Sequence, residues 1–359
     1  MKPGVFVVRD DRYLEHETGL VHPEHPNRLR AIHRMLETDF PRPLAILEPR
    51  LATMDELELV HTPLHIEKVL QTANYDFTHL APDTPASAKT YLAAWLAVGG
   101  CLKGLEALIA GEARAVFALV RPPGHHALPD RASGFCIFNN LGITARQALK
   151  RYGLTRILIV DWDIHHGNGL QQLFYDQKEV FYFSSHYLSS FPQTGEWQDA
   201  GAGEGLGYTV NIPLPKNFED EDILHCYREV LGPIINRYKP QLILVAAGFD
   251  AHQRDPLGRT RLTEKGFGWL TQLLLEFGEE IGGVPVLLAL EGGYDTKALA
   301  SSVRQVLLVL TAQEREKLPE VATERGGELV AKAAAVHAQY GIWIDAETGG
   351  DMFKKRSVL

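Results

Sequence analysis

Short apolar runs that predict β-strands alternate with longer helical patterns through most of this chain. The runs are rich in Val, Ile and Leu, a composition typical of strands that are buried on both faces. Alternating strands and helices favour a mainly parallel sheet with helices on both faces. The predicted strands cover residues 5–8, 115–120, 156–160, 180–184, 208–212, 241–247 and 284–290. The sequence therefore predicts an α/β fold.

The segments between these strands are assigned from their periodicity and from Gly and Pro punctuation. Helices are expected at residues 29–37, 57–73, 88–110, 140–151, 170–175, 221–238, 263–282 and 297–310. Residues 75–86 carry Pro82, Asp83 and Pro85, and we expect them to form a loop. Residues 312–359 are rich in Ala and charge. We expect them to form a helical extension packed on the domain of residues 1–311.

The acidic balance of the chain argues against nucleic acid as a partner. The formal net charge is −9, whereas nucleic-acid-binding surfaces are basic; a cationic substrate or a basic peptide remains compatible. Cys101, Cys136 and Cys226 are far apart, so neither a disulfide framework nor a thiolate zinc site is expected. No uninterrupted apolar stretch reaches the roughly 18 residues of a membrane span. We expect a cytoplasmic protein that has no membrane partner and can form an oligomer.

Polar motifs follow four of the predicted strands at the point where each strand ends. They are His125-His126, the segment from Asp161 to His166, Asp250 and Tyr294. In an open α/β sheet, ligands bind beyond the carboxyl ends of the strands. Any one motif could be an ordinary turn, but the four together predict a single functional site at that edge.

The segment after residues 156–160 carries ligand-type side chains. If its backbone stays extended, side chains at i, i+2 and i+4 lie on one face, so Asp161, Asp163 and His165 should converge. Asp250 would add a carboxylate from a neighbouring strand. A set of two oxygens and one nitrogen leaves coordination positions open, as catalytic metal sites do. The set suits Zn²⁺, and Fe²⁺, Co²⁺ or Mn²⁺ would also fit.

Two adjacent imidazoles and a phenol supply the remaining chemistry. His125 and His126 follow a Pro-Pro-Gly turn and can act as base and acid beside a metal. Asp161 can accept a hydrogen bond from one of them and fix its tautomer. Tyr294 follows two glycines, and its phenol can donate to a developing oxyanion. With no G-x-S-x-G motif, these residues indicate metal-assisted hydrolysis of an acyl bond by water.

Six segments of the chain resemble the histone deacetylase and acetylpolyamine amidohydrolase superfamily, in the family's order. They are HPEHPNR at residues 22–28, RPPGHH at 121–126, GFC at 134–136, DWDIHHGNG at 161–169, AGFDAHQRDPLG at 247–258 and EGGY at 291–294. The resemblance covers residues 5–310. Within the superfamily, the chain is similar to the class II-like, bacterial-type deacetylases. It implies a single α/β domain of arginase type with a central parallel sheet of eight strands.

The resemblance also implies a role for each residue of the predicted site. The residues that match the ligands of a catalytic Zn²⁺ are Asp163, His165 and Asp250. The residues that match the acid–base and carbonyl-polarising groups are His125, His126, Asp161 and Tyr294. Among these, His126 would be the general base, and Asp161 would pair with His125.

One position in the motif resembles the class II branch. Asn168 stands where class I enzymes have an Asp that partners the second histidine, and Trp162 lies in the same motif. Asn168 would hold His126 without a negative charge. This difference leaves the division of acid and base roles between the two histidines open.

The resemblance extends to a substrate tunnel and to two sites for a monovalent cation. The tunnel and rim positions are Gly134, Phe135, Phe191, Leu257 and Asp83. The first potassium site would involve Asp161 and Ser184, and the second would involve Phe174, Val180 and Tyr208.

The implied activity is removal of an acetyl or related acyl group from a lysine of a peptide or protein, or from a small amine. Three alternatives stay open. The first is an acetylpolyamine amidohydrolase, although family members selective for polyamines can carry Glu at the position of Leu257. The second is a binuclear manganese ureohydrolase of arginase type, and the third is a non-catalytic acyl-ligand binder. Intact Tyr294, His125 and His126 argue against the third.

Overall fold

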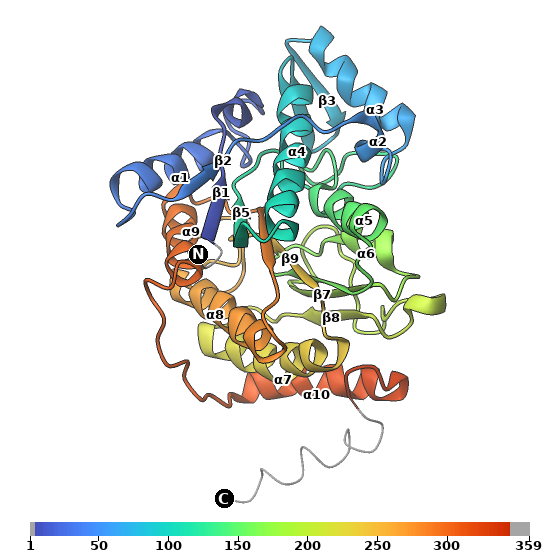
Figure 1. Cartoon of the computed structure of the whole chain (residues 1–359), viewed down its shortest axis with the longest axis vertical. Helices are drawn as coiled ribbons and strands as arrows, with labels where there is room; N and C mark the ends of the chain where they lie inside the picture. The colour runs from blue at the N-terminus through green and yellow to red at the C-terminus, as the bar shows by residue number, and fades with distance from the viewer. Residues whose placement is uncertain (1–3, 345–359) are drawn as a thin grey trace, which may run out of the picture.

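The computed structural model describes residues 4–344, and its centre is a single sheet of eight parallel strands (Figure 1). The strand order is β2-β1-β5-β10-β9-β6-β7-β8, and all neighbouring pairs are parallel. The strands are β1 (Gly4–Val8), β2 (Ala45–Leu47), β5 (Ala113–Ala118), β6 (Ile157–Asp161), β7 (Val180–His186), β8 (Thr209–Pro213), β9 (Leu242–Ala247) and β10 (Val286–Leu290). The predicted α/β class and the eight-stranded parallel sheet are confirmed.

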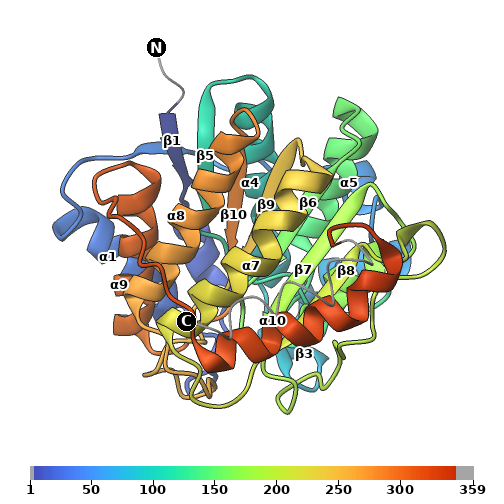
Figure 2. The ribbon, with the colours of Figure 1, turned by 90° about the horizontal axis from the view of Figure 1, so that it is seen from below.

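Helices cover both faces of this sheet (Figures 1 and 2). One face carries α4 (Thr90–Ile109), α5 (Asn140–Tyr152) and α6 (Asn168–Phe174). The other face carries α1 (Asn27–Thr38), α7 (Asp220–Tyr238), α8 (Glu264–Glu280) and α9 (Thr296–Leu310), with α10 (Glu324–His337) against α7. Two shorter helices, α2 (Met54–Leu57) and α3 (Pro63–Leu70), precede α4.

The central strands are apolar because helices exclude water from both of their faces. All residues of β6, β9 and β10 are buried. The edge strand β2 has two exposed residues among its three. A strand this short and this exposed leaves no apolar pattern, and for this reason the sequence did not predict it.

The prediction that residues 75–86 form a loop is wrong. The structure has an antiparallel hairpin there, in which β3 (Phe77–Ala81) pairs with β4 (Thr84–Ser87). Pro82 and Asp83 form its turn, in keeping with their turn propensity. Pro85 is tolerated within β4 because a two-stranded sheet leaves each strand with an unpaired edge.

Helix α4 is long and apolar enough to cross a membrane by length and composition, contrary to the expectation that no segment would be. In the fold, 72% of its apolar window is buried. Its composition is therefore explained by packing against β5 and α5.

At the other end of the chain, α10 supplies part of the predicted helical extension. A functional division at residue 311 stays a prediction, and the expectation for residues 345–359 lies outside the described residues.

The register of the sheet aligns the carboxyl ends of its central strands. Asp161 of β6 pairs with Ser184 of β7 and with Ala246 of β9, and Leu290 of β10 pairs with Ala247. The polar segments that follow β6, β9 and β10 therefore leave the sheet at one edge.

Candidate active site and metal centre

Three ligand-type side chains meet beyond the ends of β6 and β9. The Nδ1 atom of His165 lies 3.1 Å from Oδ1 of Asp163 and 2.9 Å from Oδ2 of Asp250. All three residues are buried, and one ligand atom of each lies within 4.8 Å of the others. Two buried carboxylates around one imidazole nitrogen require a compensating positive charge.

This donor set fits a divalent metal ion. Ligands of one tetrahedral zinc, bound at about 2.0–2.1 Å, lie about 3.3 Å apart, close to the separations around His165. Backbone groups hold the opposite carboxylate oxygens, because Gly292 N–H donates to Asp163 Oδ2 (2.8 Å) and Ile164 N–H donates to Asp250 Oδ1 (2.9 Å). The remaining donor atoms of Asp163, His165 and Asp250 therefore face one another.

Two glycines allow the backbone to approach these carboxylates. A Cβ atom on Gly248 would lie 2.0 Å from Asp163 Oδ2, and a Cβ atom on Gly292 would lie 2.2 Å from Asp250 Oδ2. Both separations are shorter than a non-bonded contact permits. Any larger residue at either position would displace a carboxylate from the centre.

The two carboxyl groups differ in their surroundings. Burial raises the pKa of Asp163, but His125 and His165 outweigh burial and lower it overall. Burial and the charge of Asp163 raise the pKa of Asp250. A cation held between the two would favour the ionised form of both.

Asp161 does not join this set, so the prediction that it would converge with Asp163 and His165 is wrong. Strand β6 ends at Asp161, and the backbone after it is no longer extended. Asp161 Oδ2 instead lies 3.1 Å from Nδ1 of His125 and accepts a hydrogen bond from the Tyr182 hydroxyl (3.1 Å). The structure thus places Asp161 beside His125, as the family resemblance implies.

The second histidine of the pair has a neutral partner. Nδ1 of His126 lies 2.8 Å from Oδ1 of Asn168, the first residue of α6. An amide oxygen can only accept, so His126 Nδ1 carries the proton and Nε2 has a free lone pair. The rings of His125 and His126 lie 3.9 Å apart, centroid to centroid.

The two adjacent histidines have opposite pKa shifts. Burial lowers the pKa of His125, but the charges of Asp161 and Asp163 outweigh burial and raise it to about 10. Burial, together with His125 and His165, lowers the pKa of His126 well below its usual value. His126 is therefore the histidine that is neutral, and able to accept a proton, near neutral pH.

Tyr294 lies beside the ligand set because of the turn that precedes it. Gly293 has a φ of 118°, which glycine adopts without strain, and Tyr294 N–H donates to Asp255 Oδ2 (2.6 Å). The guanidinium of Arg28 lies 5.0 Å from the centre of the Tyr294 ring. Burial and the charge of Asp250 raise the pKa of Tyr294, so the phenol keeps its proton.

A cavity of about 360 Å³ opens above these groups. Its lining residues are Asp83, His126, Gly134, Phe135, His165, Ser190, Phe191, Leu257, Arg259 and Tyr294. All five residues predicted for the tunnel and rim thus line this cavity. Ser190 and Arg259 were not predicted. Ser190 precedes Phe191 and Arg259 follows the motif at residues 247–258, but both lie outside the segments that match the family.

The predicted rim acid holds part of the cavity wall. Asp83 Oδ2 accepts a hydrogen bond from Gly134 N–H (3.0 Å), and Thr84 Oγ1 accepts one from Phe135 N–H (3.2 Å). Phe135 has a φ of 68°, a left-handed conformation that residues other than glycine rarely adopt. The β3–β4 hairpin therefore fixes the turn that presents Phe135 to the cavity.

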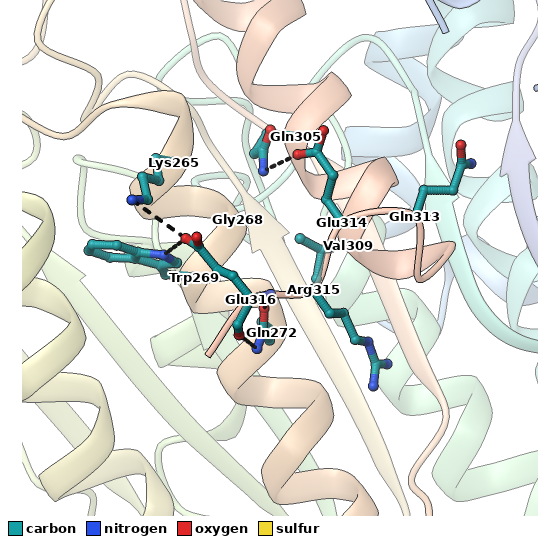
Figure 3. Close-up of a pocket in the computed structure, with 10 residues that line it drawn as sticks. All are labelled: Lys265, Gly268, Trp269, Gln272, Gln305, Val309, Gln313, Glu314, Arg315 and Glu316. Atoms are coloured by element: carbon teal, nitrogen blue, oxygen red, sulfur yellow. Dashed lines mark hydrogen bonds and ion pairs between the residues drawn. The ribbon is translucent and has the colours of Figure 1, made fainter. Parts of the chain in front are cut away.

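A larger groove, of about 530 Å³, lies elsewhere, between α8, α9 and residues 313–316 (Figure 3). Glu316 accepts a hydrogen bond from Trp269 Nε1 (2.7 Å), and Gln305 donates to Glu314 (2.9 Å). These contacts attach the segment after α9 to α8 and α9. The groove contains none of the predicted site residues.

The residues predicted to bind potassium lie in two places. Ser184 pairs with Asp161 across β6 and β7, and its hydroxyl lies 2.9 Å from Nδ1 of His186. In the second set, Phe174 ends α6, Val180 begins β7, and the carbonyl of Tyr208 accepts from Tyr182 N–H (2.9 Å). Both cation sites stay predictions.

Glu291 lies in one of the motifs but was not among the predicted site residues. Glu291 is buried, and its Oε2 accepts hydrogen bonds from the backbone N–H groups of Gly124 (2.7 Å) and His125 (3.1 Å). It therefore fixes the turn that carries the tandem histidines. Its signal was a charged residue next to glycines at the end of a buried strand.

Comparison with known proteins agrees with this geometry. The protein-family model described as "Histone deacetylase domain" matches residues 22–310 of this chain. The chain belongs to the histone deacetylase family. It is 38% identical over 324 residues to histone deacetylase 15 of Arabidopsis thaliana, covering 88% of this chain and 58% of that protein.

Two further relatives match more evenly. A protein of Archaeoglobus fulgidus named "Probable deacetylase" is 35% identical over 294 residues, which is 81% of each chain. The crystal structure of the HDA15 HD domain superposes with a TM-score of 0.89 at 33% identity, covering 99% of this chain and 98% of that one. The chain spans 58% of the length of the Arabidopsis relative.

Proposed function

We propose that this chain hydrolyses an acyl amide, in the simplest case an acetyl amide, on a lysine side chain or a related amine, with one Zn²⁺ as cofactor. The observation that carries this proposal is the meeting of Asp163, His165 and Asp250 with His126 and Tyr294 at the floor of one cavity. Membership in the histone deacetylase family supports the reaction class. The relatives' names support acetylated lysine in a protein as the substrate.

The chemistry divides among these groups by their environments. Zn²⁺ held by the three ligands would supply a Lewis acid that lowers the pKa of water and polarises a carbonyl. His126 would take the proton of the attacking water, because its Nδ1 proton is held by Asn168 and its Nε2 is free. The same imidazole could then pass that proton to the departing amine.

The remaining groups would stabilise the charge that develops during the attack. Tyr294, protonated and next to the ligand set, would donate to the oxyanion. His125, whose pKa is raised by Asp161 and Asp163, would place a positive charge beside it. Both contributions are stronger in a buried site than in water.

The cavity suits a lysine side chain. The rings of Phe135 and Phe191 and the side chain of Leu257 give it apolar walls around a polar floor, as binding of a long methylene stem requires.

We further propose a cytoplasmic location and potassium at the two predicted sites.

The test is release of acetate from an acetyl-lysine peptide by protein loaded with zinc, run beside longer acyl-lysine peptides and acetylpolyamines. We expect turnover that requires the metal and that a hydroxamate, which chelates zinc, inhibits. If only the acetylpolyamines are hydrolysed, the substrate would be a small acylated amine and not an acyl-lysine peptide. The absence of turnover on all three substrate types with a loaded metal would contradict the proposed function.

A further inference from the structure

The mouth of the cavity carries a cation that the proposed reaction does not use. Arg259 lines the cavity next to Leu257 and is exposed to solvent. Its guanidinium donates to the carbonyls of Gly258 (2.9 Å) and Pro256 (3.5 Å). These two acceptors belong to its own turn, so the side chain folds back over the turn beside Leu257.

Arg259 differs from the neighbouring arginines of its loop in having no carboxylate partner among the described residues. Arg254 pairs with Asp295 (3.2 Å), and Arg261 pairs with Glu219 (3.4 Å). Within the described part of the chain, Arg259 forms no ion pair with a carboxylate. Of these three arginines, the one at the mouth of the cavity is thus the one whose charge is not matched.

The backbone holds this arginine in place. Its carbonyl accepts a hydrogen bond from Asn217 N–H (2.9 Å), and Arg261 N–H donates to the Phe218 carbonyl (2.7 Å). A Cβ atom on Gly258 would lie 2.1 Å from the carbonyl oxygen of Asp250, so the loop packs tightly against a ligand segment. The loop therefore presents Arg259 from a fixed base.

The acidic group at the same mouth is already engaged. The carboxylate of Asp83 accepts from Gly134 N–H (3.0 Å) through one oxygen and from the Thr84 hydroxyl (2.9 Å) through the other. These bonds turn Asp83 into the wall. Arg259 is the charged group that remains available to a substrate chain at the opening.

We infer that Arg259 selects acyl-lysine residues that have an acidic residue nearby in the substrate chain. This inference rests on the proposed function. A carboxylate flanking the acyl-lysine would meet the guanidinium as the lysine stem enters the cavity, whereas a flanking Lys or Arg would be repelled. The acyl group itself lies at the far end of the cavity, so the selected charge belongs to the substrate chain and not to the acyl group.

The experiment compares acetyl-lysine peptides that differ at one flanking position. Peptides with Asp, the neutral isostere Asn, or Lys on either side of the acetyl-lysine are assayed with the wild type, Arg259→Gln and Arg259→Glu. Exposed ion pairs are worth about 0.2–1 kcal/mol, so we expect kcat/KM to favour Asp over Asn by about 1.4-fold to fivefold. The preference should disappear in Arg259→Gln and turn toward Lys in Arg259→Glu.

Arg261→Gln is the matched control, because it removes an exposed arginine from the same loop and should keep the preference for Asp. The net charge of −9 is a background shared by all peptides with one enzyme, and comparison of variants removes it. At about 1 M salt the preference should also collapse, because the screening length falls to about 3 Å.

Binding of the same peptides, labelled and measured by fluorescence anisotropy, separates this inference from the proposed reaction. Peptides that bind with the expected preference but are not hydrolysed would support the role of Arg259 and contradict the reaction. The inference would be overturned if the wild type had the same kcat/KM for the Asp and Asn peptides. It would also be overturned if Arg259→Gln kept the wild-type preference for Asp.

Discussion

The floor and the mouth of the cavity are built in different ways. On the floor, Asp163 and Asp250 are buried and held by backbone N–H groups that the sheet register places beside them. At the mouth, Phe191 is 42% exposed and Arg259 is exposed on a loop. The floor is therefore fixed by the fold itself, and the mouth is fixed by a small number of contacts between loops.

The loop that carries Phe191 shows how the mouth is held. Nδ1 of His166 accepts a hydrogen bond from the Thr194 hydroxyl (2.7 Å), because its Nε2–H is directed at Gln171 Oε1 (2.9 Å). Nε2–H of His186 donates to the Gly195 carbonyl (2.9 Å). Two buried imidazoles thus attach this loop to the end of the sheet. Substitutions on the floor should abolish chemistry, whereas substitutions at the mouth should change substrate binding.

The largest effect is expected from Asp250→Ala. Loss of a carboxylate from a three-residue ligand set should lower zinc affinity by more than the roughly 10²-fold that loss of a supporting residue costs. Elemental analysis after dialysis should find little zinc, and deacylation should fall below detection. Asp130→Ala, at a surface pair with Arg131, is the control that should keep its metal. Full zinc content in Asp250→Ala would remove this residue from the ligand set.

The next effect concerns a buried ion network that supports the floor from below. Glu24 accepts from Arg28 (2.8 Å) and Arg121 (2.8 Å), and Arg28 also donates to the Gly293 carbonyl (2.6 Å). Burial raises the pKa of Glu24, but Arg121 and Arg28 outweigh burial and lower it to about 2. Glu24→Gln should therefore lower the free energy of unfolding by about 3 kcal/mol at neutral pH.

The pH dependence gives this prediction its sign. The pKa of Glu24 is lower in the folded state than in the unfolded state, so its stabilisation is complete above about pH 4.5 and is lost as the pH falls toward about 2. Denaturant unfolding of wild type and Glu24→Gln should converge over that range. Glu37→Gln, at an exposed pair with Arg9, should change stability far less. A difference that does not depend on pH would contradict the assignment.

Tyr294→Phe should reduce kcat by about 10²–10³-fold, the cost of one oxyanion donor. Zinc content and KM should change little, because the ring and its contact with Phe135 (5.9 Å between centroids) remain. Tyr238→Phe removes a hydroxyl that donates to the Lys178 carbonyl (3.0 Å) and should leave kcat unchanged. Equal kcat in wild type and Tyr294→Phe would exclude the phenol from the reaction.

The smallest effect is expected at the mouth, from Thr194→Val. The substitution keeps the shape but removes the donor to His166, at a cost of about 1 kcal/mol. KM should rise about fivefold or less, with kcat and metal content unchanged. Thr155→Val removes an exposed hydroxyl that donates to Gln241 (3.2 Å) and should have no effect on KM. A loss of metal in Thr194→Val would show that floor and mouth are not independent.

The floor could be predicted from the sequence because parallel strands bring their carboxyl ends to one edge. Polar residues after buried strands at 160, 247 and 290 therefore had to meet, whatever the details of the loops. The direction of Asp161 could not be predicted, because β6 ends at that residue. The turn that follows it decides which neighbour each side chain faces.

The mouth was much less predictable without the family resemblance. Asp83 and Gly134 are joined by a hydrogen bond across 51 positions of the sequence, and local periodicity carries no information about such a contact. The β3–β4 hairpin was missed because Pro82, Asp83 and Pro85 together are typical of a loop. Ser190 and Arg259 reach the cavity through loops whose course depends on distant contacts.

The most direct test of the proposed metal centre is the anomalous diffraction of zinc in a crystal of the zinc-loaded protein. The described residues contain a second group of ligand types nearby, His125 with Cys136 and Glu291. We predict one zinc peak within bonding distance of Asp163, His165 and Asp250, coordinated by nitrogen and oxygen. A peak at the cysteine-containing group, or no peak at the three predicted ligands, would contradict the account.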